Sequence, residues 1–424
     1  MHDIAGIPYT SAAFDEHGAC LEAPSIAAQT RQLIVVSHGW NNNRAEAEAL
    51  YRTLFTYFAA LHPGGGAGFA IVGVIWPSKT FDFAAAGPVE AGAVAAASIG
   101  DDDKAAGREA IAAAFAQFEA VFGDGAKRAQ LAPLRALLPT IDQPAAQARF
   151  VVLLRALVQA SEGSGDVDGA DYFFGAPDPR EVFAKAQQAS SEVGAFAPGT
   201  AVQAAGIGGA ISSAFSGVAN AVGALLNITT YYEMKLRAGT VGEHGLAPLL
   251  DQLAAAANIE RVHLVGHSFG ARLVTTAAMR STTPKLHSLS LLQAAFSHNA
   301  FSPAGFFRKV VSRQRLNGPI IITHTHNDLA VGKAYAIASR ISGDATSGLG
   351  DADDVFGGLG RNGAQHMAAS EVSHVARELL DAGQAYALAP RLVHNLESSA
   401  YISGHGDVGG RQVAWALIQV FDTA

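Results

Sequence analysis

The residues best suited to chemistry lie in one short segment, Gly266-His267-Ser268-Phe269-Gly270. A serine hydroxyl is a weak nucleophile that becomes effective when a neighbouring base accepts its proton. The segment follows an apolar run at 262–265 and precedes a helical pattern at 271–280, so Ser268 is expected on a tight turn between a strand and a helix. We therefore predict that Ser268 is a nucleophile. An ordinary glycine-rich turn is the alternative.

A carboxylate and a histidine follow Ser268 in the order that such chemistry uses. Asp328 comes just after the apolar run 319–323, and His405 lies between two glycines before the last helical pattern. We predict that His405 is the general base and that Asp328 orients its ring. Asp328 could instead cap the following helical pattern. Other residues that the sequence offers for these two roles are Asp344, His298, His366 and His394.

Backbone N–H groups near Ser268 are the expected donors to a negatively charged oxygen. One belongs to Phe269, directly after the serine, and the predicted second belongs to Trp40, in the segment Ser37-His38-Gly39-Trp40 that follows an apolar run at 32–37. The residues expected to contact the substrate are close to these donors in the sequence: His38, Gly39, Asn41 and His267. A core histidine is the alternative for His38, and helix capping is the alternative for the asparagines that begin with Asn41.

The spacing of apolar runs indicates which elements carry these residues. Runs at 32–37 and 69–76 enclose a helical pattern at 45–61, which is typical of a β-α-β unit and predicts a parallel sheet. The further strands expected lie near 7–14, at 262–265, 289–292 and 319–323, and at 400–403. The further helices expected in this part lie at 246–257, 271–280, 329–341 and 411–421.

Residues 81–239 interrupt the strand pattern with alanine-rich helical segments. The helices expected there lie at 105–122, 127–138, 145–160 and 179–190. We predict an α/β core formed by 1–80 and 240–424, with 81–239 inserted as a helical cap.

The stretch from Ala201 to Leu226 is long and uncharged, since no Asp, Glu, Lys or Arg occurs between Glu192 and Glu233. Its length would allow a membrane span, but glycines and polar residues such as Gln203 dilute its hydrophobicity. A buried or lid helix is one interpretation, and contact with lipid is the other.

Composition limits the possible partners. The 424 residues are 49% hydrophobic and 16% charged, with a net charge of -8 and no long basic run, so nucleic acid is a poor candidate. A single cysteine, Cys20, excludes a cysteine-rich metal site, and we expect neither a metal nor a cofactor. Acidic residues at 351–354 fit a solvated loop better than a calcium site. No signal peptide is visible, so a cytoplasmic location is the default expectation, with export by another route open.

The segments at Ser37–Trp40, Gly266–Gly270, Asn327-Asp328 and Gly404–Gly406 together resemble the α/β-hydrolase fold serine hydrolases, in their lipase/esterase-like branch. Ile75-Trp76-Pro77-Ser78 is similar to a poorly characterised bacterial group of that superfamily. The resemblance implies a mostly parallel twisted sheet flanked by helices. It also implies cofactor-free hydrolysis of a small-molecule or lipid ester through an acyl-enzyme on Ser268. An amidase or peptidase with the same three residues, or a membrane-active protein on a hydrolase-like body, are the alternatives.

Overall fold

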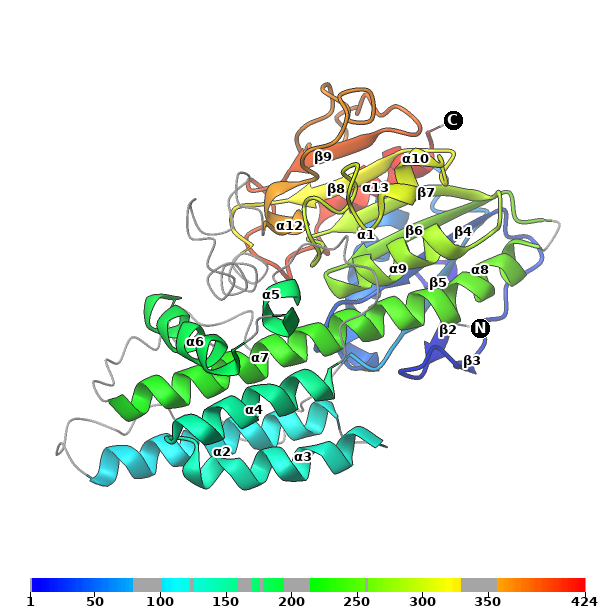
Figure 1. The fold of residues 1–424 in the computed structure, drawn as a ribbon. Helices are drawn as coiled ribbons and strands as arrows, with labels where there is room; N and C mark the ends of the chain where they lie inside the picture. Colours follow the sequence, from blue (N-terminus) through cyan, green and yellow to red (C-terminus); the bar gives the residue numbers. More distant parts are fainter. Residues whose placement is uncertain are drawn as a thin grey trace.

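The computed structural model describes residues 2–78, 101–122, 126–158, 170–175, 178–193, 214–255, 258–328 and 357–423. These residues form an α/β fold in which a mostly parallel nine-stranded sheet is flanked by helices (Figure 1). The predicted fold class is confirmed at this level. The expected helix at 329–341, the acidic residues at 344 and 351–354, and positions 201–213 lie outside the described residues.

The strands of the sheet follow the order β1-β2-β5-β4-β6-β7-β8-β9, with β3 on β2. Their bounds are β1 (His2–Ile4), β2 (Ile7–Phe14), β3 (Cys20–Glu22), β4 (Gln32–Ser37), β5 (Phe69–Ile75), β6 (Arg261–His267), β7 (Leu286–Leu292), β8 (Ile320–His324) and β9 (Val393–Glu397). Neighbours from β2 to β9 pair in parallel, whereas β1 and β3 pair antiparallel with β2.

One expected strand was wrong. The last strand is β9, which pairs with β8, and not residues 400–403. The reason is local: the backbone N–H groups of Tyr401 and Ile402 both donate to the carbonyl of Ser398, so this segment closes a turn. His405 therefore lies eight residues beyond the end of β9, in a loop rather than at a strand end.

The chain changes direction in the sheet at β4. After β4 it adds β5 on one side, and it later adds β6 on the other side of β4 before continuing outward to β9. In open parallel sheets, the crevice for a ligand lies outside the carboxyl ends of the strands at such a switch point. The loops after β4 and β6 meet there.

Both faces of the sheet are covered, which explains the unbroken apolar run of β4. Leu33 and Val35 belong to the core on the face covered by α9 (Phe269–Arg280) and α8 (Ala247–Ala254). Ile34 and Val36 belong to the core on the opposite face, under α1 (Arg44–Leu61) and α13 (Arg411–Phe421). Alternate side chains of a strand point to opposite faces, so a strand buried on both sides needs apolar residues throughout.

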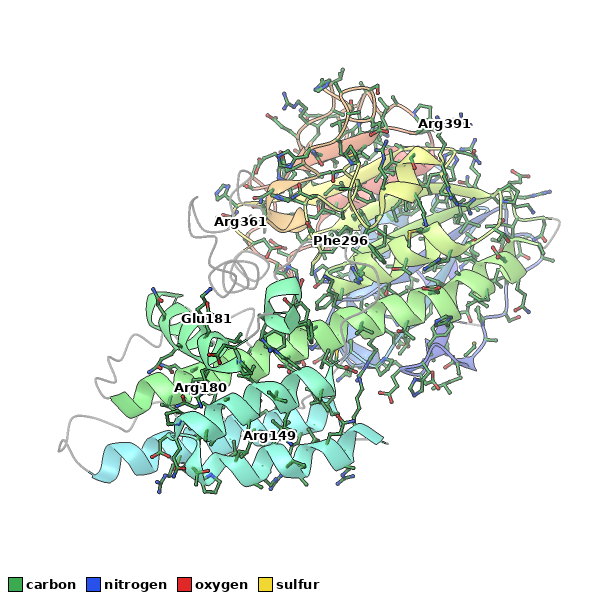
Figure 2. The ribbon with its side chains drawn as sticks, viewed as in Figure 1. Arg149, Arg180, Glu181, Phe296, Arg361 and Arg391 are labelled. Carbon is green, nitrogen blue, oxygen red and sulfur yellow. The ribbon has the colours of Figure 1, made fainter. Side chains whose placement is uncertain are left out.

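A group of helices lies to one side of the sheet (Figure 1). It comprises α2 (Asp101–Val121), α3 (Ala126–Leu137), α4 (Pro144–Leu157), α5 (Ala170–Gly175), α6 (Pro179–Val193) and the first part of α7 (Ala214–Thr240). The four helices predicted between 105 and 190 are confirmed. Figure 2 labels Arg149 on α4 and Arg180 on α6, in this group, and Phe296 within the body around the sheet. Short elements complete the description: η1 (Leu138–Thr140), a π-helical turn η2 (Val241–Leu246), α10 (Arg308–Ser312) and α12 (Leu359–Asn362).

α7 connects this helical group to the sheet. It packs against α2, α6 and α9, and it extends past the predicted boundary at 239, because it ends at Thr240 and the helical turn η2 follows directly. Its residues Ala221, Val222 and Leu225, from the uncharged stretch, are fully buried. Among the described residues, no helix combines the length and the apolar character that crossing a membrane requires.

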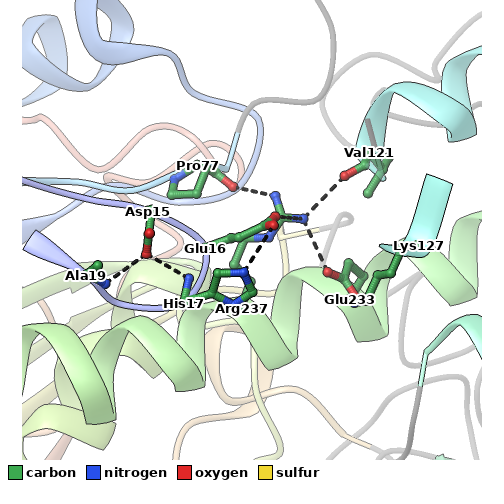
Figure 3. A network of polar contacts seen from close by, with 9 residues as sticks. All are labelled: Asp15, Glu16, His17, Ala19, Pro77, Val121, Lys127, Glu233 and Arg237. Atoms are coloured by element: carbon green, nitrogen blue, oxygen red, sulfur yellow. Dashed lines mark hydrogen bonds and ion pairs between the residues drawn. The ribbon is translucent and has the colours of Figure 1, made fainter. Parts of the chain in front are cut away.

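Arg237, near the end of α7, joins several segments through one buried guanidinium. Its partners are the Glu233 carboxylate at 3.2 Å, the Glu16 carboxylate at 3.4 Å, the Pro77 carbonyl at 2.9 Å and the Val121 carbonyl at 3.3 Å (Figure 3). Lys127 of α3 also contacts the Glu233 carboxylate, at 2.6 Å. This network links α2, α3 and α7 to the loops that follow β2 and β5.

We expect Arg237→Met to lower the free energy of unfolding by about 3 kcal/mol, because it leaves the buried Glu233 carboxylate and two carbonyls short of a donor. Urea denaturation measures the change. Arg135→Met is the matched control: Arg135 also pairs with a glutamate, Glu119, but its side chain is 64% exposed, so the loss of stability should be much smaller than for Arg237→Met. Equal losses in the two variants would contradict this role of Arg237.

His263 is a fully buried histidine near the start of β6, whereas Ser268 follows the end of the same strand. Its Nε2 lies 2.9 Å from Gln32 Oε1 and its Nδ1 lies 2.8 Å from Ser288 Oγ. Burial, with a smaller contribution from His287 and Arg261, holds the pKa of His263 well below its usual range. The ring is therefore neutral in the folded protein at neutral and mildly acidic pH.

This depressed pKa predicts a loss of stability in mild acid. Below pH of about 6.5 the unfolded chain binds a proton that folded His263 does not, so stability decreases by about 1.4 kcal/mol per pH unit from this residue. The free energy of unfolding, measured in urea at pH 7, 6 and 5, should fall less steeply for His263→Gln than for the unmodified chain. Parallel pH dependences would show that His263 is not responsible.

Candidate active site

Ser268 lies on a strained turn between β6 and α9. Its φ of 56° and ψ of -124° fall in a region that residues with a side chain rarely adopt, at a cost of about 1–3 kcal/mol. The turn needs glycine on both sides. A Cβ on Gly266 would collide with the backbone of Ala271, and a Cβ on Gly270 would collide with the carbonyls of Ser37 and His38. The predicted strand-turn-helix context of Ser268 is confirmed.

The structure brings Ser268, His405 and Asp328 together from three separate parts of the chain. His405 Nε2 lies 2.8 Å from Ser268 Oγ, and His405 Nδ1 lies 2.8 Å from Asp328 Oδ2. Asp328 is fully buried, and the side chain of His405 is 12% exposed. When Nδ1 carries the hydrogen and donates a hydrogen bond to the carboxylate, Nε2 has a free lone pair that can accept the serine proton. The arrangement can therefore deprotonate Ser268 when the hydroxyl attacks.

Asn327 connects the loop of Asp328 to the loop that leads to His405. Its Nδ2 donates to the carbonyl of Ile402 at 2.9 Å and to that of Ser399 at 3.2 Å. The sequence contains Asn327 next to Asp328, but its spacing gives no sign of this bridge, because the partners lie more than 70 positions later. The bridge aligns two loops whose side chains must meet.

The loop after β4 is held by buried hydrogen bonds. The Tyr51 hydroxyl accepts from the backbone N–H of His38 at 2.7 Å and donates to the Val74 carbonyl at 2.8 Å. The His38 ring stacks on Trp76, with centroids 5.6 Å apart, and its Nδ1 lies 2.9 Å from the Gly39 carbonyl. Burial lowers the pKa of His38 to about 4, so the ring is neutral.

Two of the residues expected to contact substrate are buried in the structure. His38 is enclosed by its own loop, β5 and Tyr51, so its ring helps to shape the loop. The ring of His267 lies 5.0 Å from that of His405, and its Nε2 lies 2.8 Å from the His405 carbonyl, so it contacts the histidine loop. Single positions in the sequence do not reveal which neighbour covers a polar ring. Of the three asparagines that begin with Asn41, Asn43 caps a helix, because it is the N-cap of α1.

Gly39 lies against Ser268, Trp40 contacts the neighbouring Phe269, and Asn41 is held to the loop after β5. A Cβ on Gly39 would come within 2.6 Å of Ser268 Cβ. The ring of Trp40 lies 6.1 Å from that of Phe269, which also packs 5.2 Å from Tyr231 of α7. Asn41 has a positive φ of 62°, and its backbone N–H donates to the Ser78 carbonyl at 3.0 Å.

The predicted donor groups at this border are available. Within the described part of the chain, the backbone N–H groups of Trp40 and Phe269 have no hydrogen-bond acceptor. As the first residue of α9, Phe269 presents one of the N–H groups that a helix leaves unpaired at its start. Both groups can donate to a bound molecule.

Other sites are less suited to chemistry. A cleft of about 540 Å³ lies between β2 and α1, where its lining includes Tyr9, Arg44 and Arg52, and none of the predicted site residues borders it. Across the described ranges, no three His, Cys, Asp or Glu side chains are placed to hold a metal ion.

We predict that Gly39→Ala lowers stability by about 1–3 kcal/mol, since the added methyl group overlaps Ser268 Cβ and forces the loop away from the turn. Thermal unfolding measures this change. Gly404→Ala is the control, because a Cβ there meets no atom within 4 Å, and it should change stability much less. Equal destabilisation would mean that the close approach at Gly39 is unimportant.

The site thus combines a strained serine, a histidine within hydrogen-bond distance, a buried carboxylate and two available backbone donors at the switch point of the sheet. Comparison of the chain with protein-family models, with curated proteins and with solved structures finds no match in any of the three.

Proposed function

We propose that this protein is a serine hydrolase that cleaves carboxylic esters through an acyl-enzyme on Ser268. The observation that carries the proposal is the hydrogen-bonded series from Ser268 Oγ through the two ring nitrogens of His405 to Asp328 Oδ2, with 2.8 Å at each step. The strained backbone of Ser268 adds support, because strain of this kind is concentrated at functional sites.

The proposed reaction has two halves. Ser268 Oγ attacks the carbonyl carbon while His405 Nε2 takes the hydroxyl proton, and the resulting oxyanion accepts hydrogen bonds from the N–H groups of Trp40 and Phe269. The imidazolium, stabilised by Asp328, then gives its proton to the departing alcohol, which leaves an acyl group on Ser268. In the second half, water attacks the acyl carbon as His405 takes a water proton. Return of that proton to Oγ releases the carboxylic acid.

We also propose that the core has the α/β-hydrolase fold and that residues 81–239 act as a helical cap. Support comes from the switch point between β4 and β6, from the strand-turn-helix at Ser268, and from α7, whose Tyr231 ring reaches Phe269 beside the serine. A helix that runs from the helical group to the site would let that group influence which substrates reach Ser268.

The surroundings of Ser268 favour an apolar acyl group. The partly exposed rings of Trp40 and Tyr231 both contact the buried ring of Phe269 next to the serine, and exposed aromatic rings bind hydrocarbon better than charged groups. A small-molecule or lipid ester is the proposed substrate class, and amides are the competing class that the same three side chains could cleave.

We expect Ser268→Ala to reduce kcat for p-nitrophenyl esters by at least about 10⁴-fold without a change in fold, because no other group can form the acyl-enzyme. A fluorophosphonate should label the unmodified protein and not this variant. Ser290→Ala is the matched control, since Ser290 is also buried near the centre of the sheet and its Oγ has no hydrogen-bond partner. It should hydrolyse esters at the normal rate.

Undiminished turnover in Ser268→Ala would refute the proposal. Parallel assays with p-nitroanilides of the same acyl groups distinguish the two substrate classes: faster cleavage of the anilides would identify an amidase.

A further inference from the structure

His267 occupies an unusual position between the nucleophile and the histidine loop. It is the last residue of β6, directly before Ser268, and only 8% of it is exposed. Its Nε2 lies 2.8 Å from the main-chain carbonyl of His405, and the two imidazole rings are 5.0 Å apart. The residue beside the nucleophile therefore contacts the backbone of the residue proposed as the base.

The protonation of His267 follows from these contacts. A carbonyl oxygen only accepts, so Nε2 must carry the hydrogen and Nδ1 must be bare. Nδ1 is buried, has no hydrogen-bond partner among the described residues, and faces Gly39, where a Cβ would come within 3.1 Å of it. Burial, together with the nearby His405, lowers the pKa of His267 to about 3, so the ring is neutral at neutral pH.

Neutrality is important because His405 becomes positively charged during the proposed reaction. A second charged imidazole 5.0 Å away would oppose that step, whereas a neutral ring with its N–H directed at the His405 carbonyl does not. A neutral His267 can thus support the loop throughout the reaction cycle.

Beyond Ile402, which accepts a hydrogen bond from Asn327, the main chain of the His405 loop makes few other hydrogen bonds to the sheet. Ser403 and Asp407 bond to each other, and the N–H of Asp407 donates to the Gly404 carbonyl, so these bonds stay within the loop. Glycines on both sides of His405 add no packing, because a Cβ on either would meet no atom within 4 Å. In the described part of the chain, the bond from His267 is the one hydrogen bond that holds the main chain of 404–406 to the sheet.

We infer that His267 is a positioning residue: its Nε2–H holds the His405 backbone so that His405 Nε2 stays within hydrogen-bond distance of Ser268 Oγ. The inference rests on the proposed hydrolase function for its kinetic consequences. The geometric part, that His267 anchors the loop, stands independently of any substrate.

The kinetic test compares His267→Ala with His267→Gln. Loss of the anchor should reduce kcat for a p-nitrophenyl ester about 100-fold, as expected for a base displaced by about 1 Å, with KM changed less than about 3-fold. Glutamine retains a neutral N–H donor of similar reach and should restore most of kcat. His267→Met fills similar space without a donor and should be impaired like His267→Ala, whereas a residue that only fills space would be rescued by methionine and glutamine alike.

The matched control is His263→Ala, which removes another fully buried histidine from the same strand, far from Ser268. It should lower the melting temperature while leaving kcat near normal, and so separates loss of stability from loss of positioning. A kcat for His267→Ala within about 3-fold of normal would overturn the inference, as would equal impairment of a well-folded His267→Gln.

A second measurement needs no substrate. Hydrogen–deuterium exchange of the peptide that covers 402–408 should be at least about tenfold faster in His267→Ala than in the unmodified chain, and near normal in His267→Gln. Unchanged exchange in His267→Ala would refute the anchor. If the unmodified protein fails to hydrolyse esters and Ser268 is not labelled, the proposed function fails, and the exchange data alone then decide the role of His267.

Discussion

The close approach of the β4 loop to the Ser268 turn is the constraint on which the rest of the site depends. The first turn of α9 packs on the carbonyls of Ser37 and His38, at a distance that leaves no room for a Cβ on Gly270. Gly39 in turn lies against Ser268. Parallel pairing of β4 with β6 brings the two loops to the same edge of the sheet, and the glycines let the backbones touch. The segments that carry the backbone N–H groups of Trp40 and Phe269 thereby lie next to each other.

Three buried histidines differ from His405 in their surroundings. His38, His263 and His267 are buried, so a proton on them would be poorly solvated and their pKa values are depressed. They act as neutral hydrogen-bonding groups that fix a loop or a strand. His405 differs because its ring is partly exposed and lies between a hydroxyl and a carboxylate. In the proposed mechanism only this ring changes its charge, and its neutral neighbours let it do so without repulsion.

Among the described residues, the long helix α7 and a buried ionic network join the helical group to the sheet. α7 carries apolar residues such as Val222 into the helical group and Tyr231 to the edge of the site. The Arg237 guanidinium then connects its last turns to the loops after β2 and β5. Since the loop after β5 also supports the Gly39 loop through Ser78, the helical group and the site share a structural element.

Much of this architecture follows from local patterns in the sequence. The apolar runs of β4, β5 and β6 predicted strands because a strand buried on both faces has no place for polar residues. The glycines around Ser268 predicted a tight turn, since only glycine tolerates such close backbone contacts. The order of Ser268, Asp328 and His405 indicated which residues to place together. Local patterns failed for the last strand, where residues 400–403 form a turn that bonds back to Ser398.

Only the tertiary structure decided which surroundings each polar side chain meets. It showed that His38 is enclosed by Tyr51 and Trp76, and that the His267 ring faces the His405 backbone 138 positions later. It also revealed Asn327 as a bridge between two loops. The physical reason is that hydrogen bonds across long separations depend on strand order and loop path, which no spacing along the chain encodes. The sequence by itself determined the central strands, the tight turn at Ser268 and the reactive residue types. Their distances, protonation states and supports came from the fold.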